Sequence, residues 1–142
     1  MYKHILAPID GSAASNRALE EAINLAKALQ AQLRLIHVID KAAIIGWISA
    51  GSVVDILHKT GQQVIDQGAA RVREAGLKVE TALIEGQQHV ADAIINDAKH
   101  WTADVIVIGT HGRRGARHLV LGSVADGVAR SATVPVLLIR EK

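Results

Sequence analysis

Short apolar runs alternate along the chain with longer segments whose apolar residues recur every three or four positions. The runs are bounded by polar residues or glycine and predict five strands, at residues 4–9, 32–39, 77–84, 105–108 and 135–139. Helical spacing follows in the intervening segments, with apolar positions at Leu19, Ala22, Ile23, Ala26 and Leu29 and at Ala91, Ile94, Ile95 and Ala98. A third helix is predicted over about 53–75 and a fourth from about Ser123 to Ala132. The predicted order is therefore β-α-β-α-β-α-β-α-β.

Glycine and proline refine the ends and the strength of these elements. Gly76 is placed to end the third helix with a left-handed cap, whereas Gly61 and Gly68 inside it weaken it by roughly 1 kcal/mol each. Pro135 enforces extended backbone at the start of the fifth strand, and a proline there suits a strand at the edge of a sheet.

The strict alternation predicts an α/β fold: a doubly wound, five-stranded parallel sheet with helices on both faces. Ligands of such sheets bind at the carboxyl ends of the strands, where the strand order reverses. Two strand ends carry unusual chemistry, PIDGS (8–12) after the first strand and GTHGRRG (109–115) after the fourth. If both serve one site they must be neighbours, which favours the strand order 3-2-1-4-5.

Composition narrows the possibilities. The 142 residues match the length of one domain, 1–142, and its core must be built from aliphatic side chains because aromatic residues make up only 2%. The absence of cysteine excludes disulfides, thiolate metal sites and a cysteine nucleophile. No segment approaches the roughly 18 uninterrupted apolar residues of a membrane span, so we expect a cytoplasmic protein. The formal charge of +2 is too small to indicate that the whole surface binds nucleic acid. Positive charge is nevertheless dense locally, at Arg113, Arg114 and Arg117.

The turn after the fourth strand predicts an anion site. Gly109 and Gly112 allow a ligand to approach the backbone closely, and Gly122 precedes a helix that Ser123 is placed to cap. The free amides of the first helical turn, at Ser123, Val124 and Ala125, carry the positive end of the helix dipole, and phosphate is their natural biological guest. The arginines of this local cluster either donate charge-assisted hydrogen bonds to phosphate or lie exposed on a solvated loop. The sequence is compatible with both interpretations.

The familiar phosphate motifs do not match this turn. GTHGRRG has G-x-x-G-x-x-G spacing rather than G-x-G-x-x-G, and G-x-x-x-x-G-K-[ST] occurs nowhere. What does fit is Gly109, two residues, Gly112, nine residues, Gly122 and Ser123. Together with PIDGS and the terminal VPVLLI, this spacing resembles the ATP-binding branch of the universal stress protein family. The resemblance runs from KHILAPIDGSAASNRAL to VPVLLIR and so covers essentially the whole chain.

The resemblance implies an adenine nucleotide alpha hydrolase-like fold and a cytoplasmic, homodimeric, ATP-binding regulator of the stress response. It implies that ATP or another adenine nucleotide, with Mg²⁺ held through phosphates and water, is the ligand. Carried over by position, the implied contacts are Pro8, Ile9 and Asp10 for ribose and phosphate, the Val38 backbone for adenine, Gly109, His111, Gly112, Arg113 and Arg114 around the phosphates, and Gly122, Ser123 and Val124 closing the loop. Gly115 is an additional glycine that should loosen the arginine-rich segment.

Several groups carry alternative interpretations. Asp10 either caps the first helix or contacts the nucleotide and its Mg²⁺ shell, and both roles are compatible. A slow ATPase or phosphotransferase in the same pocket is the alternative function, with Asp10 and His111 as its only acid-base candidates; catalysis is the less favoured interpretation. The histidines lack H-E-x-x-H spacing and Ser123 lacks a G-x-S-x-G elbow, which disfavours a metal site and a serine nucleophile. Scarce aromatic residues disfavour recognition of single-stranded nucleic acid.

The two tryptophans and the last strand complete the expectations. Trp101 is predicted to fill the core at the end of a helix, whereas Trp47 lies in the apolar connection AAIIGWISAG (42–51). That connection fits a pocket wall, a partner-contact patch, a mobile lid or local packing. An edge position for the fifth strand would let two copies pair across a two-fold axis, and the resemblance also implies such a dimer.

Overall fold

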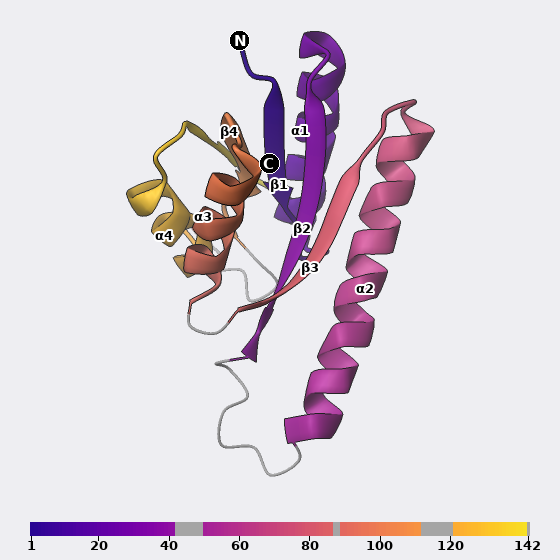
Figure 1. The fold of residues 1–142 in the computed structure, drawn as a ribbon, viewed down its shortest axis with the longest axis vertical. Helices are drawn as coiled ribbons and strands as arrows, with labels where there is room; N and C mark the ends of the chain where they lie inside the picture. Colours follow the sequence, from indigo (N-terminus) through magenta and orange to yellow (C-terminus); the bar gives the residue numbers. More distant parts are fainter. Residues whose placement is uncertain (42–49, 87–88, 112–120, 142) are drawn as a thin grey trace.

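The computed structural model describes residues 1–41, 50–86, 89–111 and 121–141. Strands and helices alternate along it (Figure 1): β1 (His4–Pro8), α1 (Ala13–Leu29), β2 (Gln32–Asp40), α2 (Ala50–Glu74), β3 (Glu80–Gly86), α3 (Val90–Trp101), β4 (Val105–Gly109), α4 (Ser123–Ser131) and β5 (Val136–Ile139). Each predicted strand and helix is present, which confirms the predicted alternation. The connection that contains Trp47 lies outside the described residues from 42 to 49.

The five strands form a parallel sheet in the order β3-β2-β1-β4-β5. This is the order predicted from the shared chemistry of the first and fourth strand ends. The chain moves outward from β1 through β2 to β3 and then returns to the centre at β4, next to β1. The reversal of strand order therefore lies between β1 and β4, and β5 is an edge strand as expected.

Helices cover both faces of the sheet, α1 and α2 on one and α3 with α4 on the other (Figure 1). Alternate residues of each strand point to opposite faces, so two aliphatic cores form. Ile5 and Leu35 belong to the core beneath α1 and α2, and Leu6 and Ile36 to the core beneath α3 and α4. Trp101 is half-buried against the second of these cores, as predicted, with its ring edge-on to His4 at 5.1 Å between centroids.

The third strand begins later than predicted, at Glu80 rather than residue 77. The reason lies in the end of α2, where Gly76 has a left-handed φ of +85°. The amide of Gly76 donates to the carbonyl of Arg73 at 2.9 Å, and the amide of Leu77 donates to that of Val72 at 3.2 Å. This pair of bonds closes the helix as a Schellman motif and takes Leu77 away from the sheet ladder.

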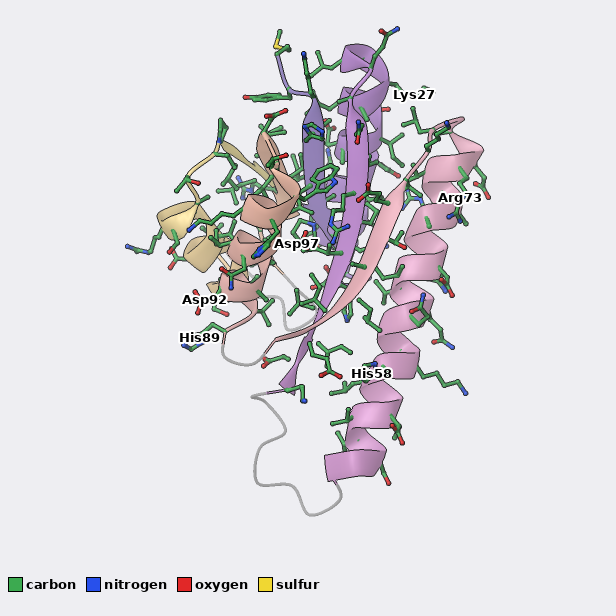
Figure 2. The ribbon with its side chains drawn as sticks, in the orientation of Figure 1. Lys27, His58, Arg73, His89, Asp92 and Asp97 are labelled. Atoms are coloured by element: carbon green, nitrogen blue, oxygen red, sulfur yellow. The ribbon has the colours of Figure 1, made fainter. Side chains whose placement is uncertain are left out.

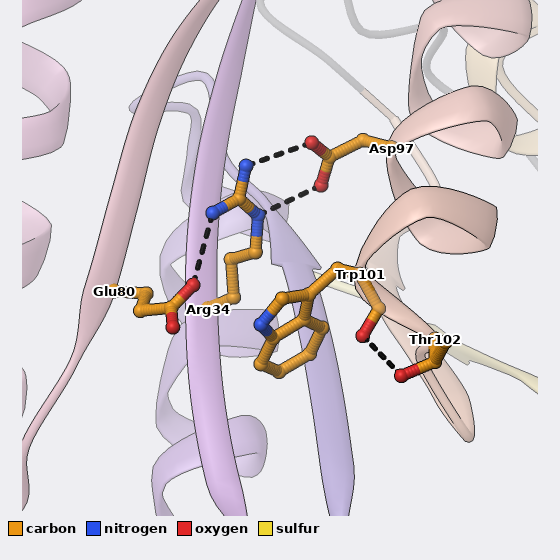
Figure 3. Close-up of polar contacts among 5 residues, drawn as sticks. All are labelled: Arg34, Glu80, Asp97, Trp101 and Thr102. Atoms are coloured by element: carbon orange, nitrogen blue, oxygen red, sulfur yellow. Dashed lines mark hydrogen bonds and ion pairs between the residues drawn. The ribbon is translucent and has the colours of Figure 1, made fainter.

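An ion-pair group ties α3 to the sheet near the edge strand β3. The guanidinium of Arg34 donates two bonds to the Asp97 carboxylate, at 2.9 and 2.8 Å, and a third to Glu80 at 3.1 Å (Figure 3). Hydrogen bonding to Asp97 is the largest reason that the pKa of Arg34 is raised above its ordinary value. Three elements, β2, β3 and α3, are joined by these contacts.

Candidate functional site

The segments that follow β1 and β4 meet where the strand order reverses. The Ser12 hydroxyl donates to the backbone carbonyl of His111 at 3.4 Å, across 99 positions of sequence. At Gly109 the backbone approaches the start of α1 so closely that a Cβ would lie 2.7 Å from the carbonyl carbon of Ala14. Glycine is required at this position for the two segments to come together. The predicted neighbourhood of PIDGS and the glycine turn is therefore present.

Backbone hydrogen bonds fix the segment after β1. The amide of Ile9 donates to the carbonyl of Ile36 at 2.8 Å, and the amide of Asp10 donates to the Ser15 hydroxyl at 3.0 Å. The Asp10 carboxylate accepts from the amide of Ser12 at 2.8 Å, which is an Asx turn around Gly11. Pro8, Ile9 and Asp10 therefore reach the carboxyl end of the sheet in a defined conformation.

The capping interpretation of Asp10 is resolved by these contacts. Ser12 is the N-cap of α1, and its hydroxyl accepts from the amide of Ser15 at 3.2 Å. Asp10 accepts from the amide of that capping residue, so it supports the cap that Ser12 supplies. The predicted contact of Asp10 with nucleotide or with a Mg²⁺ shell stays a prediction.

A second set of bonds closes the base of the loop that follows β4. The amide of Thr110 donates to the carbonyl of Ile139 at 2.9 Å, and the amide of Gly122 donates to the carbonyl of Thr110 at 2.7 Å. A Cβ at Gly122 would lie 2.9 Å from that same carbonyl oxygen. The imidazole Nδ1 of His111 lies 3.0 Å from the Thr110 hydroxyl. The predicted contacts Gly112, Arg113 and Arg114, with Gly115 and Arg117, lie outside the described residues.

The start of α4 differs from the expectation by one position. Gly122 is the N-cap, with φ of −63° and ψ of 154°, and Ser123 is the first helical residue, so the prediction that Ser123 caps the helix is wrong. The Gly122 amide is already bonded to Thr110, and this contact fixes the extended residue that precedes the helix. Glycine offers no side-chain acceptor, so it cannot cap the amides of Ser123, Val124 and Ala125. Ser123 is exposed, and the amides of the first turn of α4 carry the positive end of the helix dipole.

Val38 lies beyond the paired part of β1. The register of β1 with β2 ends at Pro8 opposite Ile36, and Val38 is two residues further along β2. Its side chain packs against the core beneath α3 and α4. On the β3 side of the sheet, Val38 pairs with Ile84. The backbone of Val38 thus lies toward the carboxyl end of the sheet, and the adenine contact that the family resemblance implies for it stays a prediction.

Sequence reasoning did not identify His37, whose Nδ1 lies 2.7 Å from the carbonyl oxygen of Ile9. A signal was available in the strand pattern. His37 takes an inward position of β2, in phase with the buried residues Leu35 and Ile39, and a polar side chain at such a position needs a partner. Ser15 and Thr110 are likewise buried polar residues of the site that the motif does not mark.

A further hollow adjoins Val38 of this region, because Ile84, the partner of Val38 in β3, lines it. This hollow of about 560 Å³ lies between β3 and α3, lined along the helix by His89, Asp92 and Asp97 among others (Figure 2). It contains none of the predicted nucleotide contacts. Among the residues that the structure describes, no group of three or more His, Asp or Glu side chains is placed to hold a metal ion. No helix in the same residues is both long and apolar enough to cross a membrane.

Comparison with known proteins assigns the fold to a family. The family model described as the universal stress protein family matches residues 1–140. The chain belongs to the universal stress protein family. Universal stress protein MJ0531 of Methanocaldococcus jannaschii is 35% identical over 144 residues, covering 99% of this chain and 84% of that protein. The family resemblance noted from the sequence is confirmed.

Two solved structures of the same fold extend the comparison. Protein MJ0577 of the same organism superposes with a TM-score of 0.88 at 25% identity, covering 100% of this chain and 98% of that one. A universal stress protein solved in complex with cAMP superposes with a TM-score of 0.73 at 25% identity, covering 99% and 98% of the two chains. The doubly wound sheet found here is the fold of these universal stress proteins.

Proposed function

We propose that this protein is an ATP-binding universal stress protein, a homodimeric cytoplasmic regulator of the stress response whose conformation depends on nucleotide occupancy. The observation that carries the proposal is the meeting of two segments at the reversal of strand order. The Asp10 segment after β1 and the start of α4, whose N-cap Gly122 makes no side-chain cap bond, are brought together by contacts of Ser12 with His111 and of Gly122 with Thr110. Helix N-termini at such points bind phosphate groups through their free amides.

In the proposed complex, each part of a nucleotide has its own side of the site. The Val38 backbone receives the adenine, and Pro8, Ile9 and Asp10 receive the ribose and the first phosphate. Gly109, His111, Gly112, Arg113 and Arg114 surround the remaining phosphates, and Gly122, Ser123 and Val124 close over them. Mg²⁺ enters with the phosphates and their water, with Asp10 as the carboxylate that faces its shell. The cAMP complex of a relative with this fold supports an adenine nucleotide as the ligand class.

The proposal is tested by the small molecule that the protein carries. We expect mass spectrometry of freshly prepared, denatured protein to find an adenine nucleotide. Gly122→Val should abolish its retention and raise the ATP Kd at least about tenfold, because the new Cβ would lie 2.9 Å from a backbone oxygen that cannot move aside cheaply. Gly51→Val is the matched control, since nothing lies within 4 Å of a Cβ there.

Circular dichroism of both variants separates loss of binding from loss of fold. If the wild-type protein releases no adenine nucleotide and calorimetry with ATP, AMP and cAMP gives no heat, the proposal is wrong. Equal retention by the Gly122 and Gly51 variants would show that any bound nucleotide occupies another site.

A further inference from the structure

The peptide that joins Ile9 to Asp10 is held at both ends by side chains. Its carbonyl oxygen lies 2.7 Å from Nδ1 of His37, and its amide donates to the Ser15 hydroxyl at 3.0 Å. A carbonyl oxygen only accepts hydrogen bonds, so Nδ1 of His37 must carry the hydrogen. Two opposing bonds prevent this peptide plane from rotating, and the plane sets the direction in which Asp10 leaves the chain.

The imidazole ring is itself held in place by α2. A Cβ at Gly61 would lie 2.8 Å from Cδ2 and 3.3 Å from Nε2 of His37. The bare backbone of the helix therefore lies directly against the ring edge opposite the Ile9 bond. The glycine that weakens the helix by propensity is required here by the ring and by Leu83, whose Cδ1 would also lie 2.8 Å from a Cβ.

The same helix also holds the side chain of Ile9. Gly68 lies two turns after Gly61 on α2, and a Cβ there would lie 2.7 Å from Cδ1 of Ile9. Ile9 is 6% exposed, and its amide is bonded to the carbonyl of Ile36. The amide, carbonyl and side chain of Ile9 are thus all fixed immediately before the predicted nucleotide contact Asp10.

We propose that His37 is a positioning residue of the nucleotide site, acting through its Nδ1 hydrogen on the Ile9 carbonyl, with α2 as the support for its ring. The inference rests on the proposed function, because it assigns to that same site a residue that never touches the ligand. By orienting the Ile9–Asp10 peptide before the nucleotide arrives, His37 lowers the ordering that binding would otherwise require. Any displacement of α2 along the sheet would be transmitted to Asp10 by this route.

Three substitutions of His37 separate the hydrogen bond from the bulk of the ring. In His37→Asn the amide nitrogen is bonded to Cγ, as Nδ1 is in histidine, so the variant keeps an N–H donor at that place. His37→Gln moves its amide one carbon further out. His37→Leu has no donor. We expect the Kd for ATP measured by calorimetry to rise about tenfold in the Leu and Gln variants, the equivalent of one typical hydrogen bond. The Asn variant should stay within about threefold of wild type.

Glycine substitutions in α2 test the support of the ring without altering the imidazole. Gly61→Ala should raise the Kd for ATP severalfold because its methyl group would push against the ring and against Leu83, and the double variant Gly61→Ala with Leu83→Ala, which relieves the second contact, should keep the increase. Gly51→Ala, in open space on the same helix, should leave the Kd unchanged. Nitrogen-15 NMR of the wild-type side chain should show the hydrogen on Nδ1 both with and without ATP. This readout does not depend on any variant folding.

The outcomes are distinguishable from those of the proposed function. If wild-type protein binds ATP and the Leu variant binds it equally well, His37 does not position the site and the proposed function stands. A wild-type spectrum with the hydrogen on Nε2 would also overturn the assignment. Failure of the wild-type protein to bind any adenine nucleotide would overturn both proposals together.

Discussion

The carboxylate of Asp104 accepts hydrogen bonds from two successive backbone amides near the start of the chain. The amide of Lys3 donates at 2.6 Å and that of His4 at 2.8 Å, and these bonds hold the pKa of Asp104 below its ordinary value. A carboxyl group whose pKa is lower in the folded state contributes stability above its unfolded pKa of about 3.9 and loses it as the pH falls through the folded pKa. Asp104 therefore stabilises the attachment of β1 at neutral pH and not in acid.

The corresponding prediction concerns Asp104→Asn. We expect this variant to unfold at lower urea concentration than wild type at pH 7. The difference should shrink as the pH falls below about 4 and vanish only below the lowered folded pKa of Asp104, where both side chains are neutral. Urea titrations between pH 2 and pH 7 measure it. Asp55→Asn, at an exposed position of α2, should show no such convergence. A difference that persisted unchanged at pH 2 would contradict the assigned role of the charge.

At the scale of the elements, the sequence predicts best those features that local periodicity determines, and less well those that hydrogen bonds at the ends of elements determine. The alternation of strands and helices follows from local periodicity, and the order of the sheet followed from the requirement that two polar strand ends share a site. The start of β3 was misplaced because the capping bond from Leu77 to Val72 keeps Leu77 at the end of α2. The cap of α4 was misplaced because the bond from Gly122 to Thr110, across the loop, fixes the residue before the helix. His37 was missed because its partner is the backbone carbonyl of Ile9, just after β1, and no spacing along the chain displays that contact.

The attachment of α3 to the sheet gives a second prediction. Asp97 is 11% exposed and Arg34 is 18% exposed, so removal of the guanidinium leaves a mostly buried carboxylate without its two donors. We expect Arg34→Met to destabilise the fold by about 2–3 kcal/mol, less than a fully buried pair would lose, and Glu80→Gln by under about 1 kcal/mol because Glu80 is 56% exposed. Equilibrium urea unfolding gives both values.

A double replacement distinguishes the charge from the packing of this group. Arg34→Met combined with Asp97→Leu should recover much of the stability that the single change loses, because no buried charge is left unpaired. If the double variant is less stable than Arg34→Met by the full amount of the Asp97 change, the ion pair is not what holds α3 to the sheet.

For the whole molecule, we propose that a second copy pairs at the β5 edge of the sheet. β5 lies at the end of the strand order, and its neighbouring residues Leu137 and Leu138 are 41% and 38% exposed. Successive strand residues point to opposite faces, so both faces of this edge are accessible to a partner. An apolar edge strand with unpaired backbone groups is a surface that proteins normally cover. A two-fold axis beside β5 would cover it in both copies at once.

The proposed dimer predicts that a charge at this edge separates the copies. Leu137→Lys and Leu138→Lys should each shift sedimentation equilibrium from dimer toward monomer, since a lysine would be buried without a partner in the paired edges. Ile56→Lys is the matched control, because Ile56 is 63% exposed on α2. This helix packs over β2 and β3, at the opposite end of the strand order from β5. Dissociation caused by the Ile56 change and not by the Leu137 change would move the interface to α2. In that case the dimer contact would lie on the helix that supports the His37 ring at Gly61.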